Sequence, residues 1–460
     1  MSAELLSRIQ FGLTIGFHIL FPTLNLGLGL FLVYMEGMWL KTKNPVYLTI
    51  AHFWTKVFAL TFGMGVVSGV VMSYELGTNF SGYTHAVGPV LGSLFAYEVL
   101  SAFFLEAGFL GIMLFGWNRV SPKVHFSATC LVMLGTAISA FWILSANSWM
   151  QTPAGYRVSD GQFMVVSWHD VIFNPSTVVR FFHMMMASYL TTCFFVAGVS
   201  AYYLLQKRHI ETARKCFSTV LLAAAILAPV QIVLGDMVGL KVHHHQPLKT
   251  AAMAGLWDTQ KGAPLLLFAQ PDVQAEKNRY AIKIPKLESL LNTHRINGKM
   301  IGLKSVPPEN RPKVNIVFYS FRIMVGSGFL FLAIAGWALY LRWRGRLYQN
   351  KRLLQICVLT TPTGFVSTIA GWLTAESGRQ PWIVQGLLKT QDAVSPNISS
   401  DQVLLSLTVF ITVYGIVFSF YLVYLFRMLR QGPDKTSVTV QNTLFTYLQQ
   451  RNQTTAQNDG

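Results

Sequence analysis

Two histidines, one methionine and one glutamate lie within or at the end of long apolar segments, where polar groups are costly. They are His18, His183, Met324 and Glu376. An imidazole and a thioether form a common pair of axial ligands for a low-spin haem, and a five-coordinate haem needs one further ligand such as histidine or carboxylate. These four groups would suffice for about three haems. A lone buried histidine or methionine is more often a packing residue. The hypothesis of haem binding therefore depends on all four residues together.

Residues 371–382 read Gly-Trp-Leu-Thr-Ala-Glu-Ser-Gly-Arg-Gln-Pro-Trp and close an apolar run. They place Trp372, Glu376 and Arg379 at an expected membrane boundary. Charged groups at such a place usually have a function. Arg322 is charged inside another apolar run, two residues before Met324, and its guanidinium could pair with a haem propionate.

Two more carboxylates, Glu98 and Glu106, lie inside a single apolar run. Eight helical steps leave them about 80° apart around the helix and ~12 Å apart along it. That geometry suits two stations of a proton relay, because burial raises the pKa of a carboxyl group toward neutrality. The alternative is a pair of structural hydrogen bonds to neighbouring helices.

Composition predicts an all-α, polytopic membrane protein. Of 460 residues, 52% are hydrophobic and only 12% are charged, and mean hydropathy is +0.43, whereas soluble domains have about 25% charged residues. Apolar runs long enough to cross a bilayer predict nine transmembrane helices, at 9–35, 51–74, 90–116, 124–148, 178–205, 217–235, 314–341, 353–373 and 402–426.

The basic residues indicate orientation. Net charge is +17, but Lys and Arg mostly flank the apolar runs, which predicts membrane lipid rather than nucleic acid as the partner. The positive-inside rule then places the N-terminus outside, with four regions: helices 1–6 in 1–235, an extracytoplasmic loop in 236–313, helices 7–9 in 314–430 and a cytoplasmic polar tail in 431–460.

This topology predicts which residues share a depth in the membrane. Glu376 is expected at the outer face, level with the start of the first span, Glu75 at the end of the second, Asn147 and Gln151 at the end of the fourth, and the start of the fifth. The run His243-His244-His245 is interpreted as loop surface, with a metal or proton-related role as the alternative.

At these residues the sequence resembles subunit I of the cytochrome bd-type quinol oxidases, in the short-loop form that includes cyanide-insensitive members. The similar segments occur in the family's order over nearly all nine spans. They are Arg8-Ile9-Gln10-Phe11 with His18, Gly77-Thr78-Asn79, 98–106, 147–151, His183, Gly235-Asp236, Phe321-Arg322-Ile323-Met324 and Gly378-Arg379-Gln380-Pro381-Trp382.

The resemblance implies a bacterial inner-membrane enzyme that oxidises quinol outside, reduces O₂ to water and generates a proton-motive force. His183 and Met324 would ligate a low-spin haem b. His18 and Glu376 would ligate two high-spin haems, either haem b and haem d or two haems b. The implied partners are a subunit II of homologous fold and, in some members, a small single-span subunit.

The resemblance also implies roles for the remaining candidates. Glu98 would lie beside the high-spin haems, Glu106 in a proton path from the cytoplasm and Trp372 between haems. Arg322 and Arg379 would steady propionates or tune potentials, with Lys56 as a further charge partner. Lys249 and Asp236 would contribute to quinol binding.

One position departs from the family pattern. A lysine followed five residues later by a glutamate is expected in the quinol loop, but here Lys249 is followed by Ala254. Asp258 or the histidine run could substitute for the missing acid. If neither does, quinol binding or specificity is altered in this protein. For the function as a whole, the alternative is a multi-pass membrane transporter without haem.

Overall fold

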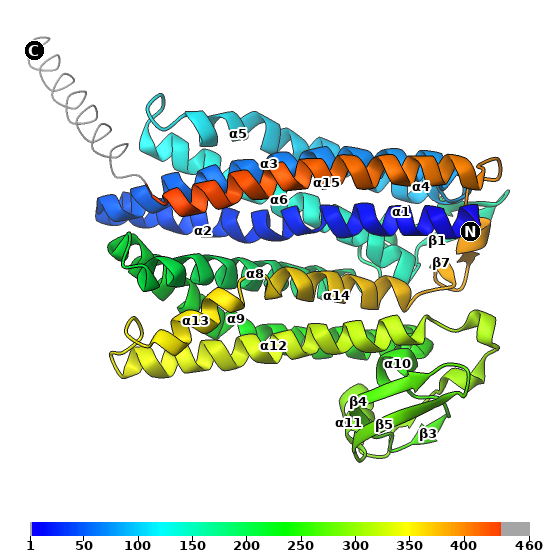
Figure 1. Ribbon diagram of the computed structural model, residues 1–460. Coiled ribbons are helices and arrows are strands. Elements are labelled where there is room, and N and C mark those ends of the chain that lie inside the picture. Colours follow the sequence, from blue (N-terminus) through cyan, green and yellow to red (C-terminus); the bar gives the residue numbers. More distant parts are fainter. Residues whose placement is uncertain (1, 434–460) are drawn as a thin grey trace, which may run out of the picture.

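The computed structural model describes residues 2–433 and shows a long bundle of helices with a small α/β unit attached at one end (Figure 1). The predicted all-α membrane fold is confirmed. Within the described residues, eight helices are long and apolar enough to cross a membrane, and one bent pair adds a ninth. The cytoplasmic polar tail was predicted for residues 431–460, and its residues from 434 onward lie outside the described part of the chain.

All nine predicted spans coincide with helical segments, most of which extend beyond the predicted limits. They are α1 (Ala3–His18) with α2 (Leu20–Thr42), α3 (Pro45–Thr78), α4 (Ser81–Glu98) through η1 (Val99–Phe103) to α5 (Phe104–Phe115), α6 (Pro122–Gln151), α7 (Trp168–Ile172) with α8 (Thr177–Leu205), α9 (Ile210–His245), α12 (Val314–Trp343), α13 (Lys351–Leu359) with α14 (Thr363–Ser377), and α15 (Ser400–Gln431).

Local sequence explains several helix starts. Asn44 and Ser121 cap α3 and α6 by accepting hydrogen bonds from backbone N–H groups, and a proline follows each cap. Proline is well suited to the first helical position because its missing N–H has no partner there. Ser399 and Gln402 form a reciprocal capping box at the start of α15, which satisfies two otherwise unpaired backbone donors.

The eighth span is broken. Helices α13 and α14 meet at an angle of 41°, and Pro362 lies in the break. Proline lacks the N–H of the helical ladder and its ring clashes with the carbonyl four residues earlier. The bend therefore follows from the sequence, although the apolar run alone predicts one continuous helix.

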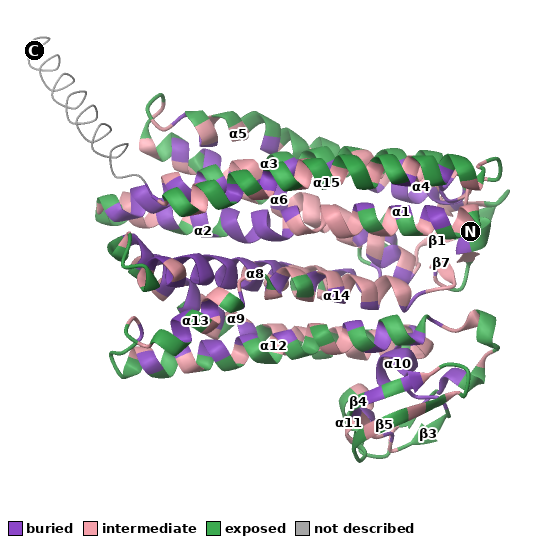
Figure 2. Cartoon of the chain, in the orientation of Figure 1, coloured by how far each residue is buried: buried purple, intermediate pink, exposed green. Residues whose placement is uncertain are grey.

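Helix α8 lies at the centre of the bundle, since most of its residues are buried, whereas α15 is largely exposed (Figure 2). One group of helices comprises α8, α9, α12 and α14, each packed against two others. Helix α2 joins this group to α3 and α6, and α1 packs between α3 and α15. The largest apolar core cluster contains residues of this four-helix group and of α2 and α3.

The connection between α9 and α12 forms the small unit at the end of the bundle (Figure 1). Its elements are α10 (Pro247–Ala254), β3 (Gln260–Lys261), β4 (Leu265–Asp272), β5 (Lys277–Ile284), α11 (Leu287–Thr293), β6 (Lys299–Met300), η2 (Leu303–Ser305) and η3 (Pro308–Asn310). Strands β4 and β5 form an antiparallel hairpin, and β3 pairs with β6. We call this unit, residues 246–313, the loop domain.

Two further hairpins lie at the same end of the bundle. They are β1 (Tyr156–Ser159) with β2 (Gln162–Val165), and β7 (Trp382–Val384) with β8 (Leu388–Lys389), which η4 (Thr390–Asp392) follows. Both follow the loop-domain ends of long helices.

The structure corrects the expected start of the loop at residue 236. Helix α9 continues to His245, so Asp236 and the three consecutive histidines are helical. The last turns of α9 are polar, so the hydropathy of the sequence does not reveal them as helix. Packing of α9 against α10 and α11 of the loop domain stabilises these turns. The interpretation of the histidine run as a surface loop is therefore wrong in its backbone conformation.

Candidate active site

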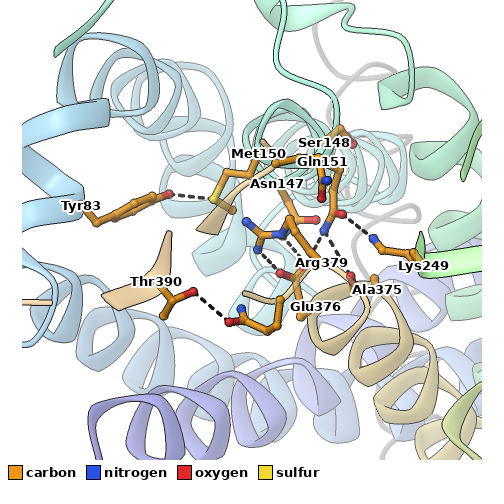
Figure 3. A network of polar contacts seen from close by, with 12 residues as sticks. Tyr83, Asn147, Ser148, Met150, Gln151, Lys249, Ala375, Glu376, Arg379 and Thr390 are labelled. Atoms are coloured by element: carbon orange, nitrogen blue, oxygen red, sulfur yellow. Dashed lines mark hydrogen bonds and ion pairs between the residues drawn. The ribbon is translucent and has the colours of Figure 1, made fainter. Parts of the chain in front are cut away.

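Glu376 lies in the last turn of α14, at the loop-domain end of the bundle, and is held by three side chains (Figure 3). Asn147 Nδ2 and Gln151 Nε2 donate to its Oε1 at 3.0 and 3.1 Å. Its Oε2 forms an ion pair with Arg379. Asn147 and Gln151 both come from the end of α6, so the predicted common depth of these residues with Glu376 is confirmed.

Two more cations extend this network. Arg180 Nη2 donates to Asn147 Oδ1 at 2.5 Å, and Lys249 Nζ donates to Gln151 Oε1 at 2.6 Å. Burial lowers the pKa of the Lys249 ammonium well below its usual range, and the nearby Glu376 carboxylate partly offsets this. A single glutamine thus links the lysine of the loop domain to the carboxylate of α14.

Sequence reasoning did not identify Arg180. It lies at the start of the fifth predicted span, three residues before His183, and its charge next to an apolar run was the available signal. Its side chain also donates to Ser148 at 3.2 Å. Arg180 therefore supports the amide that holds Glu376.

The Arg379 guanidinium has N–H donors that the ion pair with Glu376 does not use. Its side chain is 4% exposed, and Nε and Nη1 are buried without a hydrogen-bond partner among the described residues. Unpaired buried donors are unusual and need an explanation. An anionic group of a bound molecule would satisfy them.

His183 and Met324 lie on different helices of one packed group, and each has a glycine of a neighbouring helix beside it. A Cβ at Gly235 of α9 would lie 3.5 Å from His183 Cε1, and one at Gly371 of α14 would lie 3.0 Å from Met324 Sδ. His183 Nδ1 is buried and has no partner among the described residues. The glycines let both side chains lie close to a neighbouring helix, and the His183 ring keeps one nitrogen available to bind a group.

His18, at the end of α1, also lies beside a glycine of a neighbouring helix. Its Nδ1 lies 3.0 Å from Ser68 Oγ, and a Cβ at Gly69 of α3 would lie 3.2 Å from its Cε1. With Nδ1 occupied, Nε2 is left to ligate a metal. The Trp372 ring reaches from α14 toward Gly12 of α1, 4.0 Å from a Cβ built there, which places it between these two helices.

Glu98 and Glu106 both face α6. Glu98 Oε1 accepts a hydrogen bond from Ser139 at 2.7 Å, and Glu106 Cγ lies 3.0 Å from a Cβ built on Gly135, one turn away. The π-helical segment η1 between the glutamates explains this. It accommodates one extra residue, so eight residues rotate like about seven and the angular offset falls from about 80° to about 20°.

Arg322 binds backbone carbonyl groups of the loop domain and of its own helix. Its Nη1 donates to the carbonyl oxygens of Met253 and Phe318 at 2.9 and 2.8 Å, and its Nη2 to that of Leu266 at 2.6 Å. Met253 and Leu266 belong to the loop domain. Arg322 therefore fastens the loop domain to α12, and only Nε is buried without a partner among the described residues.

Lys56 is not brought into the cluster. It is exposed and lines a small pocket with Met428 and Gln431, at the opposite end of the bundle from Glu376. Lys56 and Glu75 are 19 residues apart on α3, which corresponds to about 28 Å along a helix. Nothing in this position connects Lys56 to the other candidates.

Another buried carboxylate, Glu36, lies just beyond the predicted end of the first span at residue 35 and was not among the predicted site residues. Glu36 is 1% exposed and lies in α2. It accepts a hydrogen bond from Thr129 at 2.8 Å and lies 2.9 Å from His125 Nδ1. This pair lies toward the end of the bundle opposite the loop domain, and His125 and Thr129 come from α6, which also carries the partners of Glu98 and Glu106.

Asp236, a predicted quinol-site residue, lies on α9 and pairs with His294 at the end of α11, with 3.5 Å between Oδ2 and Nε2. Asp258, considered as a substitute for the missing loop acid, is 72% exposed and pairs with Lys304 at 3.0 Å. Ala254 is buried at the end of α10.

Comparison with known proteins decides between the alternatives. The family model for cytochrome bd terminal oxidase subunit I matches residues 6–433. The chain belongs to the cytochrome bd oxidase subunit I family. The cytochrome bd ubiquinol oxidase subunit 1 of Bacillus subtilis is 36% identical over 94% of this chain and 95% of its own length.

Other relatives agree with this membership. The cytochrome bd-II ubiquinol oxidase subunit 1 of Escherichia coli is 33% identical over 93% of this chain and 96% of its own length. The bd oxidase structure from Geobacillus thermodenitrificans matches with a TM-score of 0.87 and 29% identity, covering 94% of this chain and 99% of that one.

Cytochrome bd oxidases are terminal quinol oxidases, so this chain is an oxidoreductase subunit of a respiratory electron-transport chain. The family implies haem cofactors, quinol and O₂ as substrates and a subunit II as partner, and it fits a bacterial inner membrane. The haem-free transporter is no longer supported.

Proposed function

We propose that this cytochrome bd subunit binds three haems, oxidises quinol at the loop domain and reduces O₂ inside the bundle. The observation that carries this proposal is the buried hydrogen-bonded chain from Lys249 through Gln151 to Glu376. It joins the predicted quinol-binding lysine to a predicted haem ligand. Lys249 would donate a hydrogen bond to a quinol oxygen, and Asp236 would contribute from α9.

The residues present fit the haems. His183 and Met324 would hold a low-spin haem b, and His18 and Glu376 would each hold a high-spin haem, as haem b and haem d or as two haems b. Three observations support this: the glycines beside His18, His183 and Met324, the unpaired His183 Nδ1, and the unpaired Arg379 donors. Bound haems would supply single-electron transfer and a site for O₂.

Side chains of this subunit would then position the haems and carry protons. Arg379 would pair with a propionate through Nε and Nη1, and Trp372 would fill the space between α14 and α1. Arg322 would act mainly by holding the loop domain on α12, with Nε left for an anion. For Lys56, nothing in its surroundings supports a role toward the haems.

Glu98 and Glu106 would conduct protons along the face of α6. The Glu98 and Glu106 side chains meet α6 one turn apart, at Ser139 and Gly135, so a proton path between them would run along one side of that helix. Proton uptake from the cytoplasmic side and release beside the loop domain would generate a proton-motive force. This requires the N-terminus and loop domain outside and the C-terminus inside. A small single-span subunit would be an additional partner.

The test is a reduced-minus-oxidised optical spectrum of the purified complex with its subunit II, combined with oxygen consumption. We expect bands of one low-spin and two high-spin haems, and turnover with ubiquinol or menaquinol. Absence of haem bands would refute the ligand proposals. Intact haems without turnover on either quinol would instead indicate changed quinol chemistry, as Ala254 suggests.

A glycine substitution tests the low-spin site without removing a ligand. In Gly371→Ala the new methyl group would lie 3.0 Å from Met324 Sδ, and overpacking of this kind costs about 1–3 kcal/mol. We expect a weakened low-spin haem band in the spectrum. Gly336→Ala on α12, where a Cβ meets open space, is the matched control and should leave the band unchanged. Equal spectra for the two variants would contradict the assignment of Met324.

A further inference from the structure

The loop domain lacks an acid where the family pattern has one. Ala254 is 4% exposed and ends α10, the helix that carries Lys249. A methyl group cannot accept a proton, yet each quinol that loses two electrons also releases two protons. If the loop domain oxidises quinol, another group must accept the first of these protons.

The substitutes predicted from the sequence fit poorly. Asp258 is 72% exposed and bound to Lys304, so its carboxylate is turned to solvent. His244 is exposed and packs edge-on against His245. His243 keeps Nδ1 buried without a partner among the described residues, and no hydrogen bond in the described part of the chain joins it to the end of α10.

Glu288 has the required properties. It lies in the first turn of α11 and is only 5% exposed. Asn292 Nδ2 donates to its Oε1 at 2.9 Å. Burial raises the pKa of Glu288 to about 7, with the Asn292 hydrogen bond and the positive charge of Arg322 opposing this effect. Such a carboxylate can take up and release a proton near neutral pH.

Arg322 connects Glu288 to the position of the missing acid. Helix α11, which carries Glu288, packs against β4, and Arg322 donates to the carbonyl oxygen of Leu266 in β4 at 2.6 Å and to that of Met253 at 2.9 Å. Met253 is the residue immediately before Ala254. Arg322 therefore binds both the strand on which α11 packs and the end of α10, which places Glu288 and Ala254 in the same part of the loop domain.

The other end of α11 offers a way out for the proton. His294, six residues after Glu288, pairs with Asp236 of α9, and their side chains are 61% and 42% exposed. Six helical residues span about 9 Å. The short helix thus carries a buried carboxyl group at one end and a partly exposed imidazole–carboxylate pair at the other.

We propose that Glu288 is the proton acceptor for quinol oxidation in this subunit and replaces the acid absent at Ala254. Quinol gives two electrons to the oxidase's electron-transfer chain and becomes quinone. Its two hydroxyl protons leave one after the other: each converts the Glu288 carboxylate to a carboxylic acid, which releases that proton toward the Asp236–His294 pair and water before the next one is taken up. This inference rests on quinol oxidation at the loop domain, as proposed above.

The test uses the complete complex with its subunit II. Oxygen consumption is measured with short-chain ubiquinol and menaquinol, and separately with ascorbate and tetramethyl-p-phenylenediamine, which delivers electrons without quinol protons. General-base catalysis is worth about 10²–10⁴-fold, so Glu288→Gln should lower quinol turnover at least tenfold. Activity with the artificial donor and haem content should stay unchanged. Adding Ala254→Glu to Glu288→Gln should restore quinol turnover.

Several outcomes would overturn the role of Glu288. One is quinol turnover within twofold of wild type in Glu288→Gln, and another is an equal loss with both kinds of donor. A loss that neither Glu288→Asp nor Ala254→Glu relieves would assign Glu288 to folding of the loop domain. A loss in His243→Gln but not in Glu288→Gln would transfer the role to His243. Asp258→Asn is the exposed control and should behave as wild type.

Failure of the underlying function gives a different result. A wild-type complex that consumes oxygen with the artificial donor but with neither quinol would contradict quinol oxidation itself, and with it the role of Glu288. A wild-type complex active with quinol, together with an unaffected Glu288→Gln variant, would contradict the role of Glu288 alone.

Discussion

Met324→Leu is expected to abolish the low-spin haem signal while leaving the protein folded. Leucine has nearly the volume of methionine, and exchanges of this kind usually cost less than about 1.5 kcal/mol in a core. Leucine has no thioether, so the iron would lose one axial ligand and become high-spin. Loss of a group that supports a metal ligand already costs roughly 10–100-fold in activity, and we expect at least this loss in quinol turnover. The reduced-minus-oxidised spectrum measures the change.

Met35→Leu provides the control for this experiment. Met35 is fully buried in α2 within the main apolar core and has no expected role in ligation. Its substitution should leave the spectrum unchanged. A Met324→Leu spectrum that matches wild type would show that another residue supplies the second axial ligand.

Glu376→Ala is expected to remove one high-spin haem and to destabilise the complex. The carboxylate is the proposed iron ligand and the ion-pair partner of Arg379, whose side chain is 4% exposed. Removing one member of a buried ion pair costs about 3–5 kcal/mol, because the remaining charge stays buried without compensation. Haem content per complex and the thermal midpoint of the purified protein measure the two effects.

Glu4→Ala is the matched control for the electrostatic effect. Glu4 and Arg8 form a helical ion pair at 3.4 Å, with side chains that are 38% and 29% exposed, and such surface pairs contribute about 0.3–0.5 kcal/mol. Glu4→Ala should therefore preserve both haem content and thermal midpoint. An unchanged haem content in Glu376→Ala would contradict iron ligation by this residue, whatever the thermal midpoint.

The polar network around Gln151 has a consequence for how the parts of the protein cooperate. Gln151 donates to Glu376 and accepts from both Lys249 and Gln246. Movement of α10 on binding a ligand would alter the hydrogen bonds of Gln151 directly. The loop domain is thus attached to the bundle through the groups proposed to do chemistry, and Arg322 provides a second attachment at Met253 and Leu266.

Depth in the membrane could be read from the sequence. Apolar length and the alternation of basic connections assign each residue a distance from one membrane face, and this put Glu376, Asn147 and Gln151 at one level. Their hydrogen bonds confirm that assignment. Depth is predictable because it depends on position along a single helix, which rises by a nearly constant ~1.5 Å per residue.

Contacts between helices could not be read in the same way. Arg322 was placed at a reasonable depth, but its bonds to the loop domain depend on how residues 246–313 fold back on α12. Glu288 could not be predicted as a site residue, because a single glutamate in a polar loop has no distinguishing sequence pattern. Its burial arises only when α11 packs against α9 and the loop-domain strands.

The sequence by itself therefore determined the helical membrane fold and the common level of Glu376, Asn147 and Gln151, and it predicted a set of haem ligands. Only the tertiary structure decided which side chains meet, because rotation around a helix axis depends on packing. Glu98 and Glu106 illustrate this difference. Their separation along the chain follows from the sequence, whereas the π-helical segment between them makes both side chains face α6. The same holds for His183 and Met324, whose neighbouring glycines come from helices far away in sequence.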